Sequence, residues 1–225
     1  MRHFEVELDK LQRRLLEMAG LVESAIHWSV RSLVERDEAQ AQQVLQNEAR
    51  INQMQIEIDG LTTRLLALHQ PMAQDLRFLT AIIKINSDLE RMGDLAVNIV
   101  ERSIDLIRRP AIKPLIDIPR MADLAESMVR KSLNAFVERN PELARSVLVS
   151  DDAVDNLKDA VYQELIGFMQ SDSSVVPGAV DLIFVAHNLE RIADHATNIA
   201  EDVLFLVKGI DVRHHAEEGS TEPQP

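Results

Sequence analysis

The chain contains one amphipathic segment twice, about one hundred residues apart. The segment LERMGDLAVNIVE begins at Leu89, and LERIADHATNIAE begins at Leu189, with eight of thirteen positions identical. A second pair, LVERDEAQAQQVL from Leu33 and FVERNPELARSVL from Phe136, shares six of thirteen positions at an offset of 103. Self-similarity at a fixed spacing is typical of a repeated structural unit. The repeat therefore predicts a chain that folds as two copies of one unit.

Within each copy the apolar residues follow a three-four spacing, which predicts amphipathic helices. No sustained period-two alternation indicates a strand. Pro71 interrupts the pattern in the first copy, and Asn140-Pro141 and Pro177 are typical helix starts in the second. The spacing and these boundaries predict helices over about 8–36, 38–68 and 74–107, and over 119–138, 141–170 and 177–208.

The two copies are separated by RRPAIKPLIDIP, a segment with three prolines. Proline disfavours helix continuation, so this segment is expected to be a linker. The predicted fold is all-α, with two tandem pseudo-symmetric three-helix bundles. We expect a first bundle over 1–109, a linker over 110–118, a second bundle over 119–210 and a disordered tail over 211–225, which lacks an apolar pattern.

Charge limits the possible partners. The chain has 24 basic and 37 acidic side chains, a net charge of −13, which argues against phosphate-backbone binding to nucleic acid and favours cations or basic protein surfaces. The absence of cysteine suits a reducing compartment and excludes thiolate metal sites. The first residues lack the apolar stretch of a signal peptide, and no apolar run is long enough to cross a bilayer. A soluble, cytoplasmic protein is expected.

Each repeated segment places oxygen-bearing side chains on one helical ridge. At about 100° per residue, Glu90, Asp94, Asn98 and Glu101 fall within an arc of about 80°. The second ridge consists of Glu190, Asp194, Asn198 and Glu201. An ordinary solvated face is one interpretation. However, solvated faces usually mix signs, because like charges four residues apart are destabilising, and here the acidic pair recurs in both copies. This recurrence favours cation binding.

One helix cannot surround an ion, so the preceding helix must supply further ligands. Carboxylate and amide oxygens suit hard cations, and iron or manganese also accepts carboxylates. The additional candidates are Glu48 and Asn52 with Asp88 in copy one, and Asp151, Asp152, Asp155, His187 and Asp202 in copy two. Copy two offers more charged ligands, so we expect it to bind metal more strongly. His195 lies at the apolar boundary of its helix and is expected to be a packing residue.

Templates for catalysis are absent from the sequence. There is no glycine-rich phosphate loop, Gly-x-Ser-x-Gly or His-Glu-x-x-His, and no cysteine nucleophile. No histidine has a glutamate three residues before it, which argues against a ferritin-like di-iron oxidase. These absences favour a protein that is not an enzyme.

The segment LHQPMAQDLRFLTAIIKINSDLERMGDLAVNIVE resembles the PhoU family of phosphate-signalling regulators. It is similar to the family's Pro-x-Ala-x-Asp-Leu-Arg segment and to the Glu-Arg-x-x-Asp helix that follows. The two Glu-x-x-x-Asp motifs, Glu90/Asp94 and Glu190/Asp194, match the duplicated family motif, and the resemblance extends to about residue 208. The second loop, SDSSVVPGAVDLI, departs from the pattern because it lacks the Leu-Arg signature. Glu48 and Asn52 also stand where aspartates are commoner in the family.

The resemblance implies two tandem three-helix bundles with metal clusters at the motif surfaces, containing iron, zinc or magnesium-like ions. It implies a homodimeric negative regulator that links the ATPase subunit of the phosphate ABC transporter to a membrane sensor histidine kinase, reaching the membrane only through these partners. Two alternatives stay open: a multinuclear-metal enzyme, either a phosphatase or an oxidase, and a metal-buffering or accessory protein of a different phosphate transporter.

Overall fold

The computed structural model describes residues 2–209 and contains helices throughout, with no strand in that range. The elements are α1 (Arg2–Glu35), α2 (Glu38–His69), α3 (Gln74–Ile107), α4 (Asp117–Glu138), α5 (Pro141–Ser171), a 3-10 turn η1 (Ser173–Val175) and α6 (Val176–Lys208). The all-α prediction is confirmed. The segment between α3 and α4 spans 108–116, so it begins and ends two residues before the predicted linker over 110–118. The predicted tail over 211–225 lies outside the described residues.

The turn that ends the first helix of each bundle is built identically in the two copies. Arg36 and Arg139 both adopt positive φ, 56° and 51°. The next residues, Asp37 and Asn140, accept hydrogen bonds from the first amides of α2 and α5 through their side chains. Capping satisfies amide groups that have no partner within the helix. The recurring segment from Leu33 and Phe136 thus specifies a helix stop followed by a capped helix start.

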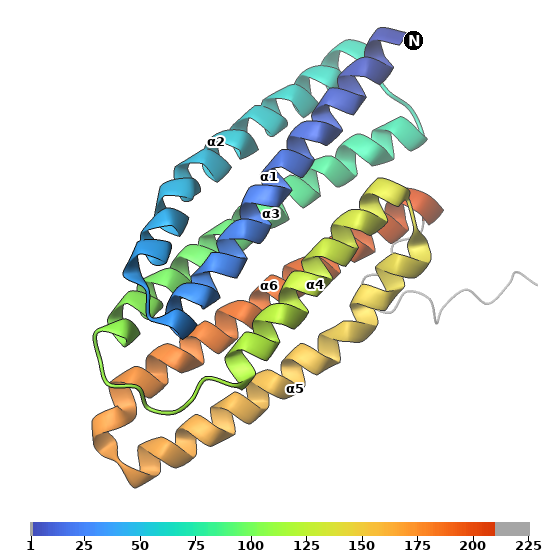
Figure 1. Ribbon diagram of the computed structural model, residues 1–225. Helices are drawn as coiled ribbons and strands as arrows, with labels where there is room; N and C mark the ends of the chain where they lie inside the picture. Colours follow the sequence, from blue (N-terminus) through green and yellow to red (C-terminus); the bar gives the residue numbers. More distant parts are fainter. Residues whose placement is uncertain (1, 210–225) are drawn as a thin grey trace, which may run out of the picture.

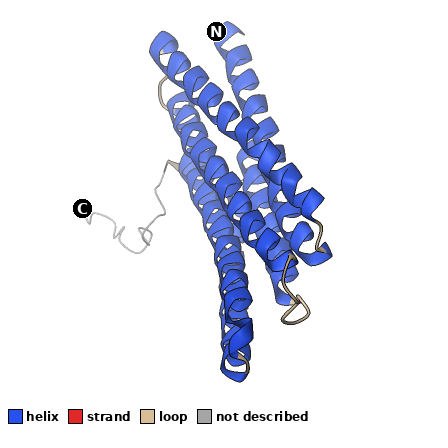
Figure 2. Cartoon of the chain, turned by 90° about the vertical axis from the view of Figure 1, so that its left-hand side faces the viewer, coloured by secondary structure: helices blue, strands red, loops and turns tan. Residues whose placement is uncertain are grey.

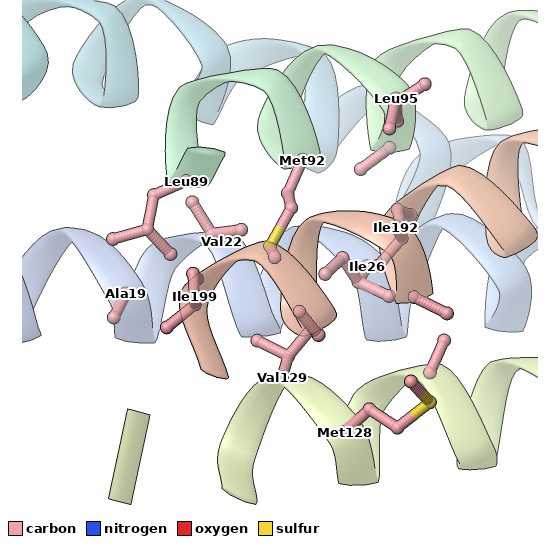
Figure 3. Close-up of a cluster of buried hydrophobic side chains, with 14 of the residues drawn as sticks. Ala19, Val22, Ile26, Leu89, Met92, Leu95, Met128, Val129, Ile192 and Ile199 are labelled. Atoms are coloured by element: carbon pink, nitrogen blue, oxygen red, sulfur yellow. The ribbon is translucent and has the colours of Figure 1, made fainter. Parts of the chain in front are cut away.

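Figures 1 and 2 show α1–α3 and α4–α6 as two elongated three-helix bundles lying side by side. Helices α3 and α6 are antiparallel, since Lys84 pairs with Asp202 whereas Arg102 pairs with Asp181. Buried apolar side chains of both bundles form one continuous core. Figure 3 shows its centre, where Met92 of α3 and Ile192 of α6 lie close to α1 and α4. The two copies therefore share one hydrophobic core and are not independent domains.

A second contact between the bundles is polar, and its two ion pairs are related by the pseudo-symmetry of the sequence repeat. Glu23 of α1 faces Arg130 of α4 at 3.7 Å, and His27 Nδ1 lies 3.3 Å from Glu126 Oε1. At the repeat offset of 103, Glu23 corresponds to Glu126 and His27 to Arg130. The two ion pairs are thus equivalent positions of one two-fold arrangement, and burial raises the pKa of both glutamates.

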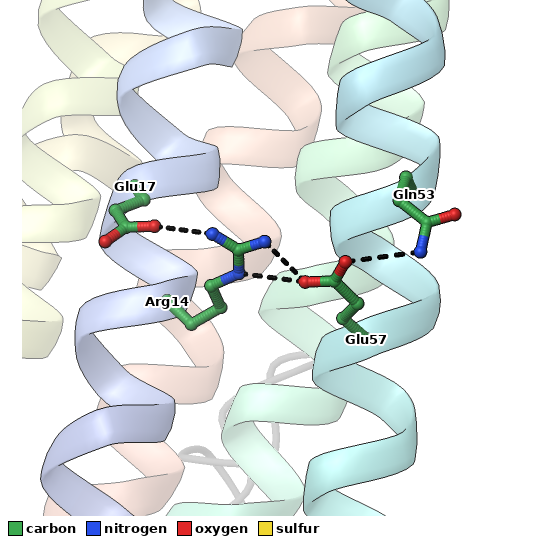
Figure 4. A network of polar contacts seen from close by, with 4 residues as sticks. All are labelled: Arg14, Glu17, Gln53 and Glu57. Atoms are coloured by element: carbon green, nitrogen blue, oxygen red, sulfur yellow. Dashed lines mark hydrogen bonds and ion pairs between the residues drawn. The ribbon is translucent and has the colours of Figure 1, made fainter.

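The outer surface of the first bundle has its own polar network (Figure 4). Arg14 of α1 donates to Glu57 of α2 and, through Nη1, to Glu17 Oε2 at 2.7 Å. Gln53 Nε2 donates to the other oxygen of Glu57 at 3.2 Å. Such partly exposed pairs contribute little stability each, about 0–1 kcal/mol. They orient α2 on α1, while the apolar core supplies most of the stability.

No helix within residues 2–209 combines the length and the apolarity required to cross a membrane.

Candidate metal-binding sites and the interface between the bundles

The two acidic ridges occupy equivalent places in the two bundles. Residues 89–100 and 189–200 have the same sequence of buried, intermediate and exposed positions throughout. Glu90 and Glu190 are half-buried, whereas Asp94, Asp194, Asn98 and Asn198 are exposed. The apolar spacing of the repeated segment produces this pattern, because it turns one stripe into the core and leaves the oxygen stripe outside.

In copy two, α5 brings further carboxylates to the ridge, as the sequence predicted. Burial, together with the nearby charges of Asp194, Asp155, Asp152 and Glu190, raises the pKa of Asp151 to about 6. Asp194 is exposed by area, but partial desolvation by the surrounding atoms still raises its pKa, with the charges of Glu190 and Asp155 adding to the shift. Five carboxylates thus share one surface of α5 and α6. Their mutual repulsion is the electrostatic condition that a bound cation would relieve.

Lys158 of α5 lies within this cluster and was missed by the sequence analysis. Its Nζ donates to Asp155 Oδ1 at 2.8 Å and to Glu190 Oε1 at 3.0 Å. These hydrogen bonds raise the pKa of the lysine, so the ammonium is fixed in its charged form. Its position three residues after Asp155 was the available signal. Lys158 acts as a built-in cation in this half of the molecule.

The other carboxylate oxygen of Glu190, unlike the one bonded to Lys158, accepts no hydrogen bond. Glu190 Oε2 is buried without a hydrogen bond, and its near neighbour is His187 Nδ1 at 3.2 Å. His187 therefore lies on the ridge, as predicted from its spacing. A buried carboxylate oxygen without a hydrogen bond is costly, and a metal ion is one group that could satisfy it.

In copy one the corresponding surface contains fewer charges. At the repeat offset of 103, Glu48, Asn52 and Gln55 stand in place of Asp151, Asp155 and Lys158. Burial and the charge of Asp94 raise the pKa of Glu90. Asn52 Oδ1 is buried without a hydrogen-bond partner, and it follows Ile51, which packs against α3 at Gly93. The amide oxygen is thus available beside the first ridge.

The side-chain arrangement of residues 2–209 does not itself form a closed coordination sphere. Within that range, no three histidine or carboxylate groups converge closely enough to hold a metal ion as they stand. The donor types fit a hard cation, but ion binding would require side chains such as Glu190 and Asp155 to turn away from Lys158.

Asp88 and Asp202, which the sequence analysis assigned to the ridges, lie instead between the bundles. Asp88 Oδ1 is 2.8 Å from Nδ1 of His195, and both side chains are buried. Asp202 accepts a hydrogen bond from Lys84 at 2.8 Å. His195 is buried as predicted, but it bonds across the interface rather than only packing. The antiparallel contact of α3 with α6, which spacing does not reveal, explains these differences.

The two ends of the second ridge face different neighbouring helices. Asn198 and Glu201, the last two members of the second ridge, line a groove of about 280 Å³ with Lys84, Asp88 and Arg91 of α3. At the equivalent place in the other half, Phe184 replaces Lys84, and its ring lies 4.9 Å from the guanidinium of Arg102. Asn98 and Glu101 are exposed on α3. Glu190 and Asp194 thus face α5, whereas Asn198 and Glu201 face α3.

Comparison with known proteins agrees with this duplicated architecture. The model of the PhoU domain matches twice, over residues 15–103 and 118–203, once in each bundle. The chain belongs to the PhoU family. Both matches include the acidic ridge, so the repeat found in the sequence is the family domain itself.

Relatives of known name match this PhoU protein over most of its length. The phosphate-specific transport system accessory protein PhoU homolog of Pseudomonas aeruginosa is 37% identical over 95% of this chain and 88% of the relative. The homolog from Aquifex aeolicus is 38% identical over 92% and 94%.

Two solved structures share the fold. The crystal structure of PhoU from Pseudomonas aeruginosa superposes with a TM-score of 0.89 at 36% identity, covering 92% of this chain and all of that one. The phosphate transport system regulatory protein PhoU from Streptococcus pneumoniae superposes at 0.86 with 31% identity, covering 93% of this chain and 99% of that one. Tandem three-helix bundles are therefore the fold of this chain.

Proposed function

We propose that this PhoU protein is a non-enzymatic negative regulator of phosphate uptake and phosphate-starvation signalling. It acts as an adaptor between the ATPase subunit of the phosphate ABC transporter and a sensor histidine kinase. The supporting observation is the double match to the PhoU domain, together with relatives named as accessory and regulatory proteins of phosphate transport. The protein works in the cytoplasm as a homodimer and reaches the membrane through its partners.

The proposal includes metal binding at the duplicated ridges. In copy two the ligands are Glu190, Asp194, Asp151 and Asp155, with His187 beside them. In copy one they are Glu90, Asp94 and Glu48, with Asn52 supplying an amide oxygen; Asn98, Glu101, Asn198 and Glu201 extend the two ridges. Support comes from the buried oxygens of Glu190 and Asn52 that have no hydrogen bond, and from the raised pKa of Asp151. Iron, zinc and magnesium are the candidate ions, because all accept carboxylate oxygen.

The regulatory role is tested in cells that lack this chain. At high external phosphate, we expect the phosphate-starvation genes to be expressed, and expression of the intact chain from a plasmid should silence them. Direct binding of the purified chain to the transporter ATPase subunit and to the kinase, measured separately and together, tests the adaptor role. Unchanged gene expression in the deletion strain would exclude the regulatory role.

Metal analysis of protein purified without chelator tests the second part of the proposal. We expect stoichiometric metal and a higher melting temperature for the loaded than for the stripped protein, because an ion that binds only the native state stabilises it. Turnover of a generic phosphoester by the loaded protein, lost in Glu90→Ala, would instead favour the enzyme alternative.

A further inference from the structure

Helix α2 packs against α1 and α3 at the outer edge of the first bundle, and one side of it points away from the core (Figure 1). This surface, the α2 stripe, advances in alternating steps of four and three residues, and all of its side chains are exposed and uncharged: Gln42, Gln46, Ala49, Gln53, Ile56, Gly60, Thr63 and Ala67. The solvent-facing side of a helix normally carries charge, and 27% of this chain is charged. Steps of four and three are the spacing at which one helix packs along another.

The second bundle shows that the repeated fold does not require this lack of charge. At the repeat offset of 103, the equivalent stripe of α5 begins at Arg145 and includes Asp152 and Asp159. It exposes apolar side chains as well, at Val149 and Ile166. The two helices therefore differ in the charge of their outer stripes, and only the stripe of α2 is free of it.

The middle of the α2 stripe places a large side chain beside a residue that has none. Ile56 is 65% exposed. Gly60 lies one turn later inside the helix, where glycine is less stable than alanine. Within residues 2–209, no atom of another helix lies within 4 Å of the point where a Cβ of Gly60 would stand, so packing inside this chain does not require glycine. Glycine at such a position allows another backbone to approach closely.

The stripe therefore contains both halves of a helix contact. Ile56 is large, whereas Gly60, Thr63 and Ala67 are small and follow it on the same side of the helix. When two copies of α2 run antiparallel, one register places Ile56 of each copy on Ala67 of the other and Gly60 of each copy opposite Thr63 of the other. A face that is complementary to itself is the condition for a two-fold symmetric contact.

Charges of both signs lie on one flank of the stripe. Glu57 and Arg64 directly follow Ile56 and Thr63, and they are two turns apart. Glu57 pairs with Arg14 but its side chain is 39% exposed. Arg64 is exposed and forms no ion pair in the part of the chain that the structure describes. The register that places Ile56 on Ala67 also brings Glu57 of each copy beside Arg64 of the other, so the flank is self-complementary in charge.

We propose that the α2 stripe is the surface through which two copies of this chain form a homodimer, with their α2 helices antiparallel. Each contact in this arrangement occurs twice, as two-fold symmetry requires. The inference rests on the homodimer of the proposed function and names its interface. Because α5 lies at the opposite edge of the molecule, the metal site of the second bundle stays outside this interface (Figure 1).

A second copy suits this surface better than a membrane or an unrelated protein. Two chains with a charge of −13 repel each other, and the repulsion is smallest where the facing surfaces carry no charge. An anionic bilayer would be repelled by the chain without gaining a partner for Glu57. An unrelated protein would have to supply an acid, a base and an apolar residue at matching places, whereas a second copy already has them.

Sedimentation velocity over a range of protein concentrations tests the interface. We expect the intact chain to dimerise, and Ile56→Glu to raise the Kd of the dimer at least tenfold, because a carboxylate would be buried against Ala67 of the second copy. Val149→Glu, on the outer stripe of α5 where the side chain is 78% exposed, is the matched control and should leave the Kd unchanged. Circular dichroism should show that both variants remain helical.

Two charge reversals on the same flank test the register. Arg64→Glu should raise the Kd about tenfold, because both symmetric pairs with Glu57 become repulsive. Arg50→Glu changes the net charge equally, but Arg50 lies two heptads before Arg64 and outside the predicted pairs, so the Kd should change less than twofold. Equal effects of the two reversals would overturn the proposed register.

Disulfide formation locates the contact directly, because the chain contains no cysteine. Gly60→Cys and Thr63→Cys are made in separate chains that carry tags of different size, then mixed and oxidised. We expect a disulfide between the two chains, since the register places these positions opposite each other. Gln163→Cys mixed with Ile166→Cys, at the equivalent places of α5, is the control and should give at least tenfold less product.

The outcomes distinguish the interface from the proposed function. A dimer that Ile56→Glu leaves intact, or disulfides of equal yield from the α2 and α5 pairs, would overturn the α2 interface while the homodimer stands. A monomer at every concentration would overturn both the interface and the homodimer. The regulatory role is tested separately, by gene expression in cells that lack the chain.

Discussion

The two bundles agree in what they bury and differ in the charges that they expose. Residues 89–100 and 189–200 have matching burial at every position, yet the helices beside them present Glu48, Asn52 and Gln55 in one half and Asp151, Asp155 and Lys158 in the other. A core tolerates little change in shape, because interiors are closely packed. Surface charges are free of that restraint. The comparison teaches that one scaffold supports two electrostatically different sites.

The largest expected difference between the halves concerns bound metal. The α5–α6 site has five acids and one lysine, whereas Glu48, Glu90 and Asp94 give the first site three acids. Since affinity rises with ligand charge, Glu190→Ala with Asp194→Ala should remove more metal per protein than Glu90→Ala with Asp94→Ala. Metal analysis of the two double variants checks this, with helicity as the folding control. Equal losses, or a larger loss from the first pair, would show that counting acids ranks the sites wrongly.

Lys158 should be the main restraint on the second site. In Lys158→Gln, which introduces the residue type found at position 55, Asp155 and Glu190 lose their ammonium partner and become available to an ion. We expect roughly tenfold tighter metal binding in the second bundle, since a nearby unit charge opposes a cation by about 1–4 kcal/mol. Titration calorimetry measures the change.

The reciprocal substitution provides the control for the lysine. Gln55→Lys should weaken metal binding in the first bundle and leave the second unaffected. If neither exchange alters affinity, then the ammonium of Lys158 moves aside without cost and the two halves differ for another reason.

Proton competition should affect the second site more than the first. Asp151 has its pKa raised from 3.8 to about 6. Below 3.8 the carboxyl is protonated in both folded and unfolded states, and above 6 it is ionised in both. The contribution of this group to the free energy of unfolding of metal-free protein therefore falls as pH rises from 3.8 to about 6.

Metal binding should show the opposite trend, because an ion and a proton compete for the same carboxylate. Affinity of the second site should increase as pH rises to about 6 and then level off. Asp151→Asn should flatten both pH profiles, measured by thermal unfolding and by metal titration. An unaltered profile in this variant would assign the pH dependence to another acid.

The smallest expected effect concerns a single methyl group in the core. An added Cβ at Gly93 would lie 3.3 Å from Ile51 Cγ2 and 3.4 Å from Ile51 Cδ1, the atom that valine lacks; the equivalent residues of the second bundle are Ala193 and Val154. Gly93→Ala alone should change the free energy of unfolding by about 1 kcal/mol or less, because better helix propensity offsets crowding. Combined with Ile51→Val, it should be about 1 kcal/mol more stable than the sum of the single changes. Urea unfolding of the three variants provides the test; strict additivity would contradict it.

The sequence predicted the helices well because their starts and stops have local causes. Asn140 and Asp37 cap the helices that follow them, and Pro71 and Pro177 lie at boundaries. Spacing also placed His187 beside Glu190. It could not assign Asp88 and Asp202 correctly, because whether a side chain faces its own bundle or the other depends on how α3 docks against α6. Lys158 was missed because only side chains that can bind a metal were sought, although it lies one turn after Asp155.

Lys84 and Phe184 occupy equivalent positions at opposite ends of the contact between α3 and α6. Two identical chains that meet around a two-fold axis receive every substitution on both sides. Fusion of the two copies into one polypeptide removes this obligation, so one end holds an ammonium against Asp202 and the other an aromatic ring under Arg102. The contact between α3 and α6 is therefore asymmetric. A binding partner can distinguish its two ends, which would be identical in a strictly symmetric pair of subunits.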